Sequence, residues 1–275
     1  MVIIGFITHE NTTLKYLGDF CASLKRQTYQ DTQILAVDNS ENNQANLIWL
    51  KNNYPAVKTI AAGRNLGFAK AANLLINQAV ALGAEYFFLA NPDTLLEPDV
   101  LEILVKAAEA NNNLTALSPR VLKWDFQNKK KTEIIDTLGI IIKPGLLFVD
   151  AKNLGGKISG PSGAAAFFNL KNLGATIRFD EDFFMYKEDC DLAYQLFKAG
   201  KHCALAPEAI VYHDRTTNAS RSERSRQEKI WSYQNQNLLF KKYWSEQNTL
   251  NKILIIFYKI CRYIYALMFE KYLLK

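Results

Sequence analysis

Short apolar runs alternate with helix-length segments through the first half of the chain, and this alternation constrains the fold more than any other feature. Runs rich in β-branched and aromatic residues, each of strand length, occupy residues 2–8, 33–37, 57–61 and 86–89. Between them, residues 14–25 and 67–82 have the spacing of amphipathic helices. Strands that alternate with helices form βαβ units with right-handed crossovers and a parallel sheet. The sequence therefore predicts an α/β fold with a mainly parallel central sheet flanked by helices.

The second half is less regular. After Pro98 we expect a helix to about Ala110, and Gly200 ends a further helix that begins at Glu188. Strands are predicted near residues 116–122, 204–205 and 210–212, and a turn at residues 160–163 leads into a small, apolar run at 164–168. Residues 124–158 show no clear period, and the triplet Lys129–Lys131 within them is predicted to be a solvated loop.

Four polar clusters follow the predicted strands of the first half. They are Thr8-His9-Glu10, Asp38-Asn39-Ser40, Gly63-Arg64-Asn65 and Asn91-Pro92-Asp93. In open α/β sheets, ligands bind at the carboxyl ends of the strands, so these clusters predict one binding rim. Each also has a purely local explanation, because Asn-Pro-Asp is typical of a turn, Asp38 suits an Asx turn, and glycine is ordinary at a helix start.

Three acids begin the helix at Glu188, namely Glu188, Asp189 and Asp191. Acids in a first turn stabilise a helix dipole, which is the simplest interpretation. Three carboxylates exceed that need, however, and neighbouring carboxylates raise one another's pKa, as a general base requires. His213 follows a strand, and a lone histidine of this kind is more often a buried structural residue than a ligand.

Charge and cysteine usage limit the classes of function. The formal net charge is +6, and from residue 241 onward seven Lys and Arg stand against two Glu, so the preceding residues are nearly neutral. We therefore expect no nucleic-acid binding, which needs basic surface on the folded domain. The four cysteines have no metal-ligand or disulfide spacing, and the short apolar start is unlike a signal peptide, so we expect a cytoplasmic protein.

The C-terminal segment 252–274 is apolar but interrupted by charge. Its longest uncharged run, 263–269, is far shorter than the roughly 20 apolar residues that a membrane span needs. The pattern predicts an amphipathic helix that lies on an anionic membrane surface, or that packs on the catalytic domain or on a second copy in a homodimer. The arginine-rich segment 220–226 is either a basic loop over the substrate or a solvated helix start, and we favour the helix start.

Six segments taken in order resemble family 2 glycosyltransferases with the GT-A fold, particularly the rhamnosyltransferase-like branch. They are VDNSE (37–41), GRNLGFAKAAN (63–73), FLANPDT (88–94), GPSGAAAFF (160–168), FDEDFFMYKEDCDLAYQLFKAGK (179–201) and VYHD (211–214). The chain departs from the family pattern at Lys70–Ala72, where small glycine-containing pairs are common, at Gln195, where arginine is usual, and at residues 214–217, where glycines are common.

The resemblance implies a GT-A domain over residues 1–215, with a nucleotide-binding half at about 1–98 and an acceptor and catalytic half at about 99–215. A helical C-terminal region at 216–275 would follow. It implies a metal at Asp93 and His213, and a base at Asp189 with Glu188 beside it. On the acceptor side it places Asp191 and Tyr186. The donor-binding residues that it implies are Thr8, Glu10, Asp38, Arg64, Asn65, Gly67, Asn91, Gly163 and Ala164, with Asp38 toward the nucleotide base and Gly163–Ala164 toward the sugar.

The function implied is inverting transfer of a sugar such as rhamnose. The donor would be a dTDP- or UDP-linked sugar held with Mg²⁺ or Mn²⁺. The acceptor would be a hydroxyl of a cell-surface polysaccharide or a lipid-linked glycan. The enzyme would be cytoplasmic and peripheral at the inner face of the cytoplasmic membrane. The alternative is a catalytically silent GT-A-like domain that binds a nucleotide or scaffolds a membrane assembly.

Overall fold

The computed structural model describes residues 1–41, 44–215 and 226–270, with only the backbone described at 269–270. The strands are β1 (Val2–Thr8), β2 (Thr32–Asp38), β3 (Lys58–Ala61), β4 (Tyr86–Ala90), β5 (Thr94–Leu96), β6 (Leu114–Asp125), β7 (Lys130–Thr137), β8 (Ile140–Lys143), β9 (Leu147–Asp150), β10 (Ala165–Asn169) and β11 (His202–His213). The α-helices are α1 (Glu10–Lys25), α2 (Ala45–Asn53), α3 (Gly67–Ala81), α4 (Val100–Ala110), α5 (Leu170–Leu173), α6 (Glu188–Lys198), α7 (Arg226–Tyr243) and α8 (Thr249–Tyr265).

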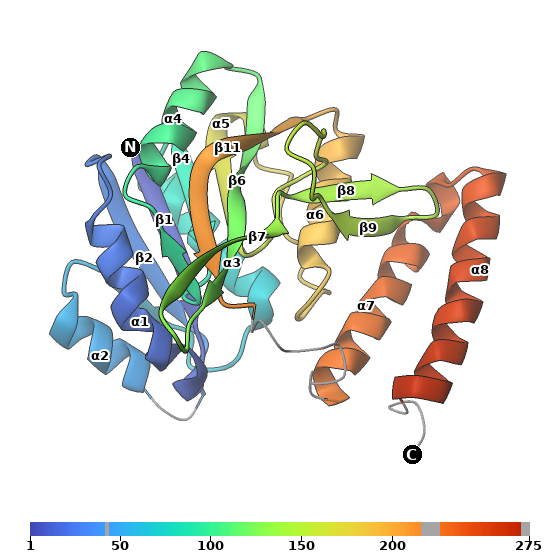
Figure 1. The fold of residues 1–275 in the computed structure, drawn as a ribbon, viewed down its shortest axis with the longest axis horizontal. Helices are drawn as coiled ribbons and strands as arrows, with labels where there is room; N and C mark the ends of the chain where they lie inside the picture. The colour runs from blue at the N-terminus through green and yellow to red at the C-terminus, as the bar shows by residue number, and fades with distance from the viewer. Residues whose placement is uncertain (42–43, 216–225, 271–275) are drawn as a thin grey trace.

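One curled sheet runs through the molecule in the order β3-β2-β1-β4-β10-β6-β11-β5, with β7 paired to β6 (Figure 1). The strands β3, β2, β1 and β4 are parallel, as predicted. The second half is mixed, because β10 runs antiparallel to both β4 and β6 while β11 and β6 are parallel. The predicted α/β class is confirmed, and the parallel arrangement belongs mainly to the first half.

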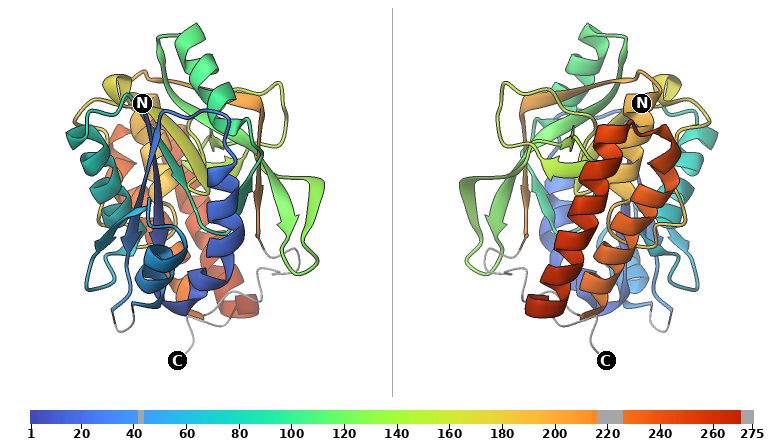
Figure 2. Two further views of the ribbon diagram at one scale, coloured as in Figure 1. Left: turned by 90° about the vertical axis from the view of Figure 1, so that its left-hand side faces the viewer. Right: turned by 90° about the vertical axis from the view of Figure 1, so that its right-hand side faces the viewer.

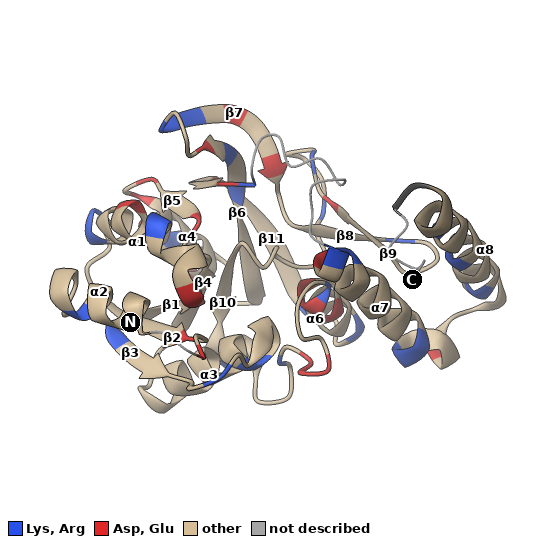
Figure 3. Ribbon diagram, turned by 90° about the horizontal axis from the view of Figure 1, so that it is seen from below, with Lys and Arg blue, Asp and Glu red and all other residues tan. Residues whose placement is uncertain are grey.

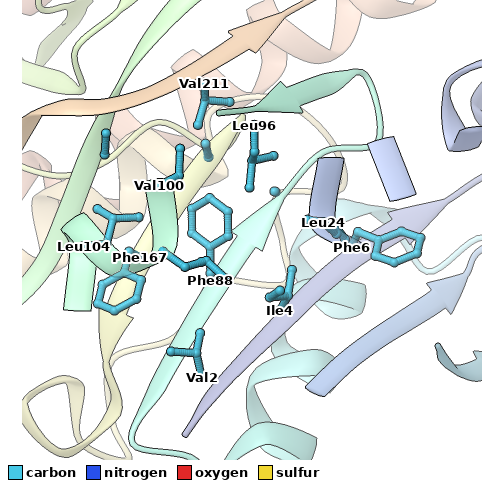
Figure 4. Close-up of a cluster of buried hydrophobic side chains, with 14 of the residues drawn as sticks. Val2, Ile4, Phe6, Leu24, Phe88, Leu96, Val100, Leu104, Phe167 and Val211 are labelled. Carbon is cyan, nitrogen blue, oxygen red and sulfur yellow. The ribbon is translucent and has the colours of Figure 1, made fainter. Parts of the chain in front are cut away.

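Each face of the sheet has its own apolar core, and β1 shows how one strand serves both. Successive side chains of a strand point to opposite faces. Val2, Ile4 and Phe6 therefore join the cluster under α1 and α4, which Figure 4 shows, while Ile3 joins the cluster under α3 and α6. Gly5 faces the second cluster, where the Phe87 ring would lie 2.6 Å from any added Cβ. Glycine is needed at position 5 because the Phe87 ring fills the space that any side chain would take.

The second half holds more structure than its sequence suggests. Residues 124–158, predicted to be irregular, contain β7 and the β8–β9 hairpin. The two short strands predicted at 204–205 and 210–212 are one strand, β11, whose register with β6 shifts between Ala206 and Ile210. The basic triplet is exposed as expected, but it lies at the start of β7, and Lys131 pairs with Glu97 at 2.6 Å. The bulge and the non-local pairing hide these strands from a reading of local periodicity.

The C-terminal helices α7 and α8 lie side by side at one edge of the molecule (Figures 1 and 2). A third apolar cluster joins them to α6 and to the β8–β9 hairpin, through residues such as Phe183, Tyr194, Phe240 and Ile255. Asn248 caps α8 by accepting a hydrogen bond from the Asn251 amide. None of the helices in the described ranges combines the length and apolarity needed to cross a membrane.

Candidate active site

The carboxyl ends of β1, β2 and β4 open onto a cavity of 380 Å³. Of the predicted donor-side residues, Asn65, Asn91 and Asp93 line it. His9, Asn39 and Pro92 also line it, and they belong to the polar clusters that predicted the rim. The remaining lining residues were not assigned to the site from the sequence, and they are Ile7, Thr12, Thr13, Lys15, Tyr16, Phe68 and Met185. The first turns of α1 therefore contribute much of this cavity, which sequence reasoning placed only at the strand ends.

Beneath the cavity, Asp38 organises the ends of β1 and β2. Its Oδ1 accepts hydrogen bonds from Thr8 Oγ1 and Ser40 Oγ, each at 2.7 Å, and from Asn46 Nδ2 at 3.3 Å. The Glu10 side chain extends the link by accepting from the Glu41 amide at 2.8 Å. Asp38 and Thr8 are both buried, so their immediate effect is to fix the geometry of the rim.

The glycine-rich turn before α3 is held by two amides. Asn65 Oδ1 accepts from the Gly67 amide at 2.9 Å, and Asn39 Nδ2 donates to the Gly67 carbonyl at 3.0 Å. Gly67 has a φ of +75°, and an added Cβ would lie 2.4 Å from the Phe184 carbonyl oxygen. The glycine thus permits the close approach of Phe184, which precedes the acid cluster. Arg64 is exposed in the same turn.

His213 stands between two aspartates. Its Nε2 lies 3.4 Å from Asp93 Oδ2, and its Nδ1 lies 2.8 Å from Asp136 Oδ2. Burial alone would lower the pKa of His213, but the two carboxylates outweigh it and raise the pKa to about 10. For Asp136, burial would raise the pKa, but the hydrogen bond to His213 and the charge of Arg215 bring it below its usual value.

The Asp93–His213 pair suits a divalent cation. Asp93 Oδ1 is buried and has no hydrogen-bond partner in the described chain, so this carboxylate oxygen is available to bind a cation. An oxygen and an imidazole nitrogen are both ligands that Mn²⁺ accepts. No three His, Cys, Asp or Glu side chains within the described ranges form a complete metal site. A cation held here would therefore need further ligands, such as diphosphate oxygens.

A second layer surrounds this pair. Arg215 Nη1 lies 3.1 Å from Asp136 Oδ1 and 3.1 Å from Asp150 Oδ2, and it thereby links β7 to the β8–β9 hairpin. Asp214, at a position where relatives often have glycine, donates its amide to the Asp93 carbonyl and accepts from Tyr16 Oη at 2.7 Å.

The acid cluster starts α6 directly after a strained turn. Tyr186 and Lys187 both adopt left-handed backbone, with φ of 71° and 73°. Such conformations cost free energy and persist where the surroundings enforce them, often at functional sites. Asn235 of α7 supplies part of that support, since its Nδ2 donates to the carbonyls of Met185 and Tyr186 at 2.8 Å each. Glu228 of α7 also accepts from Tyr186 Oη at 2.7 Å.

The three acids have different surroundings. Asp189 is oriented by two backbone amides, with Gly163 donating to Oδ2 at 3.1 Å and Cys190 donating to Oδ1 at 2.8 Å. Glu188 is buried and its Oε2 has no partner in the described chain. Burial, together with the charge of Asp189, raises the pKa of Glu188 well above its usual value. Only Asp189 combines access with a fixed carboxylate.

Asp191 does not lie at an open acceptor side, where it was expected. It is fully buried, and its Oδ1 accepts from Tyr243 Oη and Lys242 Nζ of α7, each at 2.7 Å. Its Oδ2 accepts from Gln195 Nε2 at 2.7 Å. Asp191 therefore fastens α6 to α7, and Gln195, at the position where relatives often have arginine, completes that contact.

One turn connects the two sides of the site. Gly163 donates to Asp189, and the adjacent Ala164 carbonyl accepts from the Asn91 amide at 3.0 Å. Beyond Asp189 lies a second cavity of 170 Å³. Its polar lining comes from the hairpin, α6, α7 and the end of β11, through Asp150, Tyr186, Lys187, Glu188, Asp189, Arg215 and Ser232. Asp189 thus lines the smaller cavity, and the Gly163–Ala164 turn connects it to Asn91, which lines the larger one.

Asp136 and Asn235 are supporting residues that sequence reasoning also missed. Asp136 is the second acid, after Glu133, of a strand of mixed polarity, and nothing in that sequence marks it as the buried one. Asn235 lies on a mainly polar helix, where nothing distinguishes it from its neighbours. The arginine-rich segment 220–226 lies outside the described residues except for Arg226, which begins α7.

The fold is that of the GT-A glycosyltransferases. The structure is similar to mannosyltransferase PcManGT from Pyrobaculum calidifontis in complex with GDP-Man and Mn²⁺, with a TM-score of 0.58, 18% identity and coverage of 85% of this chain and 63% of that one. It is also similar to GalNAc-T7 with UDP, GalNAc and Mn²⁺, with a TM-score of 0.61, 13% identity and coverage of 78% of this chain and 43% of that one. At these identities the similarity shows the fold alone.

The sequence itself defines the family. Residues 4–174 match the family model for glycosyl transferase family 2. The chain belongs to this family and is a glycosyltransferase, as its motifs predicted. A curated relative, the N-acetylglucosaminyl-diphospho-decaprenol L-rhamnosyltransferase of Mycobacterium tuberculosis, is 25% identical over 235 residues, which cover 76% of this chain and 75% of the relative.

Proposed function

We propose that the protein is an inverting glycosyltransferase that moves a sugar from a nucleoside-diphosphate donor to an acceptor hydroxyl, with Asp189 as the general base. The observation that carries this proposal is the position of the Asp189 carboxylate. Two backbone amides orient it, it lines the smaller cavity beside α7, and the turn that holds it also holds Asn91, which lines the larger cavity at the strand ends. A base fixed between donor and acceptor spaces is what single displacement requires.

The donor would occupy the 380 Å³ cavity. Asp38, Arg64 and Asn65 would lie on the side of the nucleotide base and ribose, and Thr8, Glu10 and Gly67 would shape that wall. Asn91, Gly163 and Ala164 would face the transferred sugar. Asp93 and His213 would hold Mg²⁺ or Mn²⁺, and the bound cation would neutralise charge on the departing diphosphate.

In the transfer step, the acceptor hydroxyl gives its proton to the Asp189 carboxylate as its oxygen attacks the anomeric carbon. The bond from that carbon to the diphosphate oxygen breaks, and the nucleoside diphosphate leaves with the electron pair. Attack from the face opposite the leaving group inverts the anomeric configuration. Glu188 suits a supporting role, because its raised pKa keeps it protonated and lessens the negative charge beside the base.

The substrates follow from the relatives and from the second cavity. We infer a dTDP- or UDP-linked donor with rhamnose as the first sugar to test, since the M. tuberculosis relative is an L-rhamnosyltransferase that acts on a decaprenol-linked glycan. The acceptor would be a lipid-linked glycan or a cell-surface polysaccharide, entering beside Tyr186 in the 170 Å³ cavity. Residues 1–215 would form the catalytic unit, working at the inner face of the cytoplasmic membrane.

A panel of sugar nucleotides tests the donor assignment. A bound ligand raises the melting temperature by mass action, so the correct donor with Mn²⁺ or Mg²⁺ should stabilise the protein in a concentration-dependent way. If none of the panel shifts the melting temperature, the donor site is wrongly assigned.

Donor hydrolysis separates an enzyme from a silent nucleotide-binding domain. A slow, metal-dependent release of nucleoside diphosphate that disappears in Asp93→Ala indicates catalysis. Binding of the donor without release, in the presence of acceptor extracts and metal, would favour the silent domain.

A further inference from the structure

Helix α8 carries apolar residues on two opposite faces, and only one of them is used by the fold. The inner face packs on the protein, with Ile255 and Ala266 fully buried and Tyr258 stacked edge-on against Phe240. The β8–β9 hairpin packs closely on this face, because a Cβ added to Gly145 would lie only 2.9 Å from Leu254 Cβ. The sequence left two alternatives for this segment, packing on the protein and attachment to a membrane surface. Packing on the protein accounts for the inner face of α8 but not for its outer face.

The outer face is exposed. Eight large side chains on it have between 48% and 66% of their surface exposed, and they recur at the spacing of three and four residues that marks one side of a helix. They are Leu250, Ile253, Ile256, Phe257, Ile260, Tyr263, Ile264 and Met268. Contiguous apolar surface of this kind is unusual on a soluble monomer and marks an interaction site.

The charges of α8 are all of one sign. Lys252, Lys259 and Arg262 lie on the helix, and no Asp or Glu occurs between Thr249 and Met268. Figure 3 shows Lys and Arg along both α7 and α8. Lys252 Nζ lies 5.6 Å from the centre of the ring of Trp244, an exposed tryptophan in the turn that connects α7 to α8. Cations and a tryptophan at the border of an apolar face are typical of helices that lie in a lipid headgroup region.

We propose that the outer face of α8 binds the surface of a bilayer containing anionic phospholipid, with the helix axis parallel to the membrane plane. Its apolar side chains would enter the upper acyl region, and Lys252 and Lys259 would contact the headgroups. A symmetric dimer through the same face is disfavoured, because it would repeat these cations in one interface without an acidic partner on the helix.

This surface would also set the orientation of the active site. Helix α7 packs against α8 and supplies Ser232 to the smaller cavity and Asn235 to the turn before Asp189. The acceptor side would therefore be held at a fixed height above the bilayer. This last step depends on the proposed function, whereas lipid binding does not, since it needs neither donor nor metal.

Cosedimentation of the full chain with vesicles tests the proposal. The protein should pellet with phosphatidylglycerol–phosphatidylcholine vesicles and bind pure phosphatidylcholine much more weakly. In the outer-face variant Ile253→Ser/Phe257→Ser/Ile260→Ser, loss of the buried apolar area should weaken binding by more than about a hundredfold. A control variant, Ile48→Ser/Ile134→Ser/Phe197→Ser, removes the same side chains from equally exposed positions elsewhere and should bind normally.

A second variant tests how much Lys252 and Lys259 contribute to membrane binding. Replacing Lys252 and Lys259 by Glu should weaken binding to the anionic vesicles by on the order of tenfold or more and remove most of its salt dependence. Binding of all variants at the wild-type level would overturn the proposal. The proposal would also be overturned if the wild-type protein does not bind vesicles and light scattering shows a dimer, since a second copy would then occupy the face.

Cys261 allows a test with the unaltered sequence. It is exposed and lies one turn beyond Phe257, while Cys21 and Cys190 are buried and Cys203 is partly buried. An environment-sensitive fluorophore on Cys261 should shift to the blue when anionic vesicles are added. An unchanged emission spectrum at saturating lipid would contradict membrane contact along this face. Donor hydrolysis by the same labelled protein shows whether the catalytic proposal stands independently.

Discussion

The two halves of the active site are built differently. On the donor side, polar residues follow the ends of β1, β2 and β4, and the parallel sheet alone brings them together. On the catalytic side, Asp189 and His213 depend on partners from β7, α7 and the turn at Gly163. The donor side is thus encoded locally, strand by strand. The catalytic side is assembled from contacts between residues 26 to 77 positions apart, such as Gly163 with Asp189 and Asp136 with His213.

The comparison predicts that the largest effect comes from the catalytic side. Replacing Asp189 by Asn should reduce turnover by about 10²- to 10⁴-fold, because the amide cannot take the acceptor proton. Donor affinity, measured by calorimetry, should change little, since the carboxylate contacts the Gly163 and Cys190 amides rather than the strand-end cavity. Substantial turnover in Asp189→Asn would move the base to another residue and remove the proposed division of labour.

The next effect concerns Asp136, which touches neither cavity but holds His213. In Asp136→Ala the imidazole loses the partner of its Nδ1, so the affinity for Mn²⁺ in the presence of nucleoside diphosphate should fall by about 10- to 100-fold. Electron paramagnetic resonance of free Mn²⁺ measures this without turnover. Asp136→Asn, whose amide oxygen still accepts a hydrogen bond, should recover part of the affinity.

Asp150→Asn is the matched control for Asp136. Asp150 shares Arg215 with Asp136 but makes no contact with His213. Its Mn²⁺ affinity should stay near the wild-type value. Equal losses in the two variants would show that Arg215, and not the orientation of His213, connects this region to the metal.

The donor side and the catalytic side show what the sequence could and could not predict. The strand ends predicted that Asp93 and Asp38 share one rim of a parallel sheet, but each also fitted a simple turn, and their roles came from the family resemblance. Asp136 lies on a strand that was predicted to be irregular, since the pairing of β7 with β6 includes register shifts and leaves no clean alternation. Asp191 was grouped with its neighbours by proximity in sequence, whereas helical geometry turns it toward Lys242 and Tyr243. Local patterns identify the elements, but long-range contacts decide which side chains reach the site.

Asn235 tests whether α7 maintains the catalytic turn. Asn235→Ala leaves the Met185 and Tyr186 carbonyls without this donor, next to two left-handed residues, and should lower the free energy of unfolding by about 1–3 kcal/mol. Urea denaturation gives the value. Asn237→Ala is the control on the same helix. Among the described residues, the Asn237 side chain donates to the Tyr233 carbonyl within α7 alone, so its loss should cost less. Equal destabilisation by the two changes would mean that the turn does not depend on α7.

A final prediction concerns the pH dependence that arises from Glu188. Its pKa in the folded protein is raised by burial and by the charge of Asp189, whereas in the unfolded chain it should be about 4.3. The folded state therefore binds the proton more tightly. The stability from this group is complete below the unfolded pKa and is lost as the pH rises toward the folded one. Glu188→Gln removes this titration, so its advantage over the wild type should grow by on the order of 1 kcal/mol per pH unit above about pH 5. Urea titrations at several pH values measure the difference, and parallel wild-type and variant curves would show that Glu188 ionises normally. In that case the site would hold two ionised carboxylates side by side, and the assignment of the base to Asp189 alone would lose its electrostatic support.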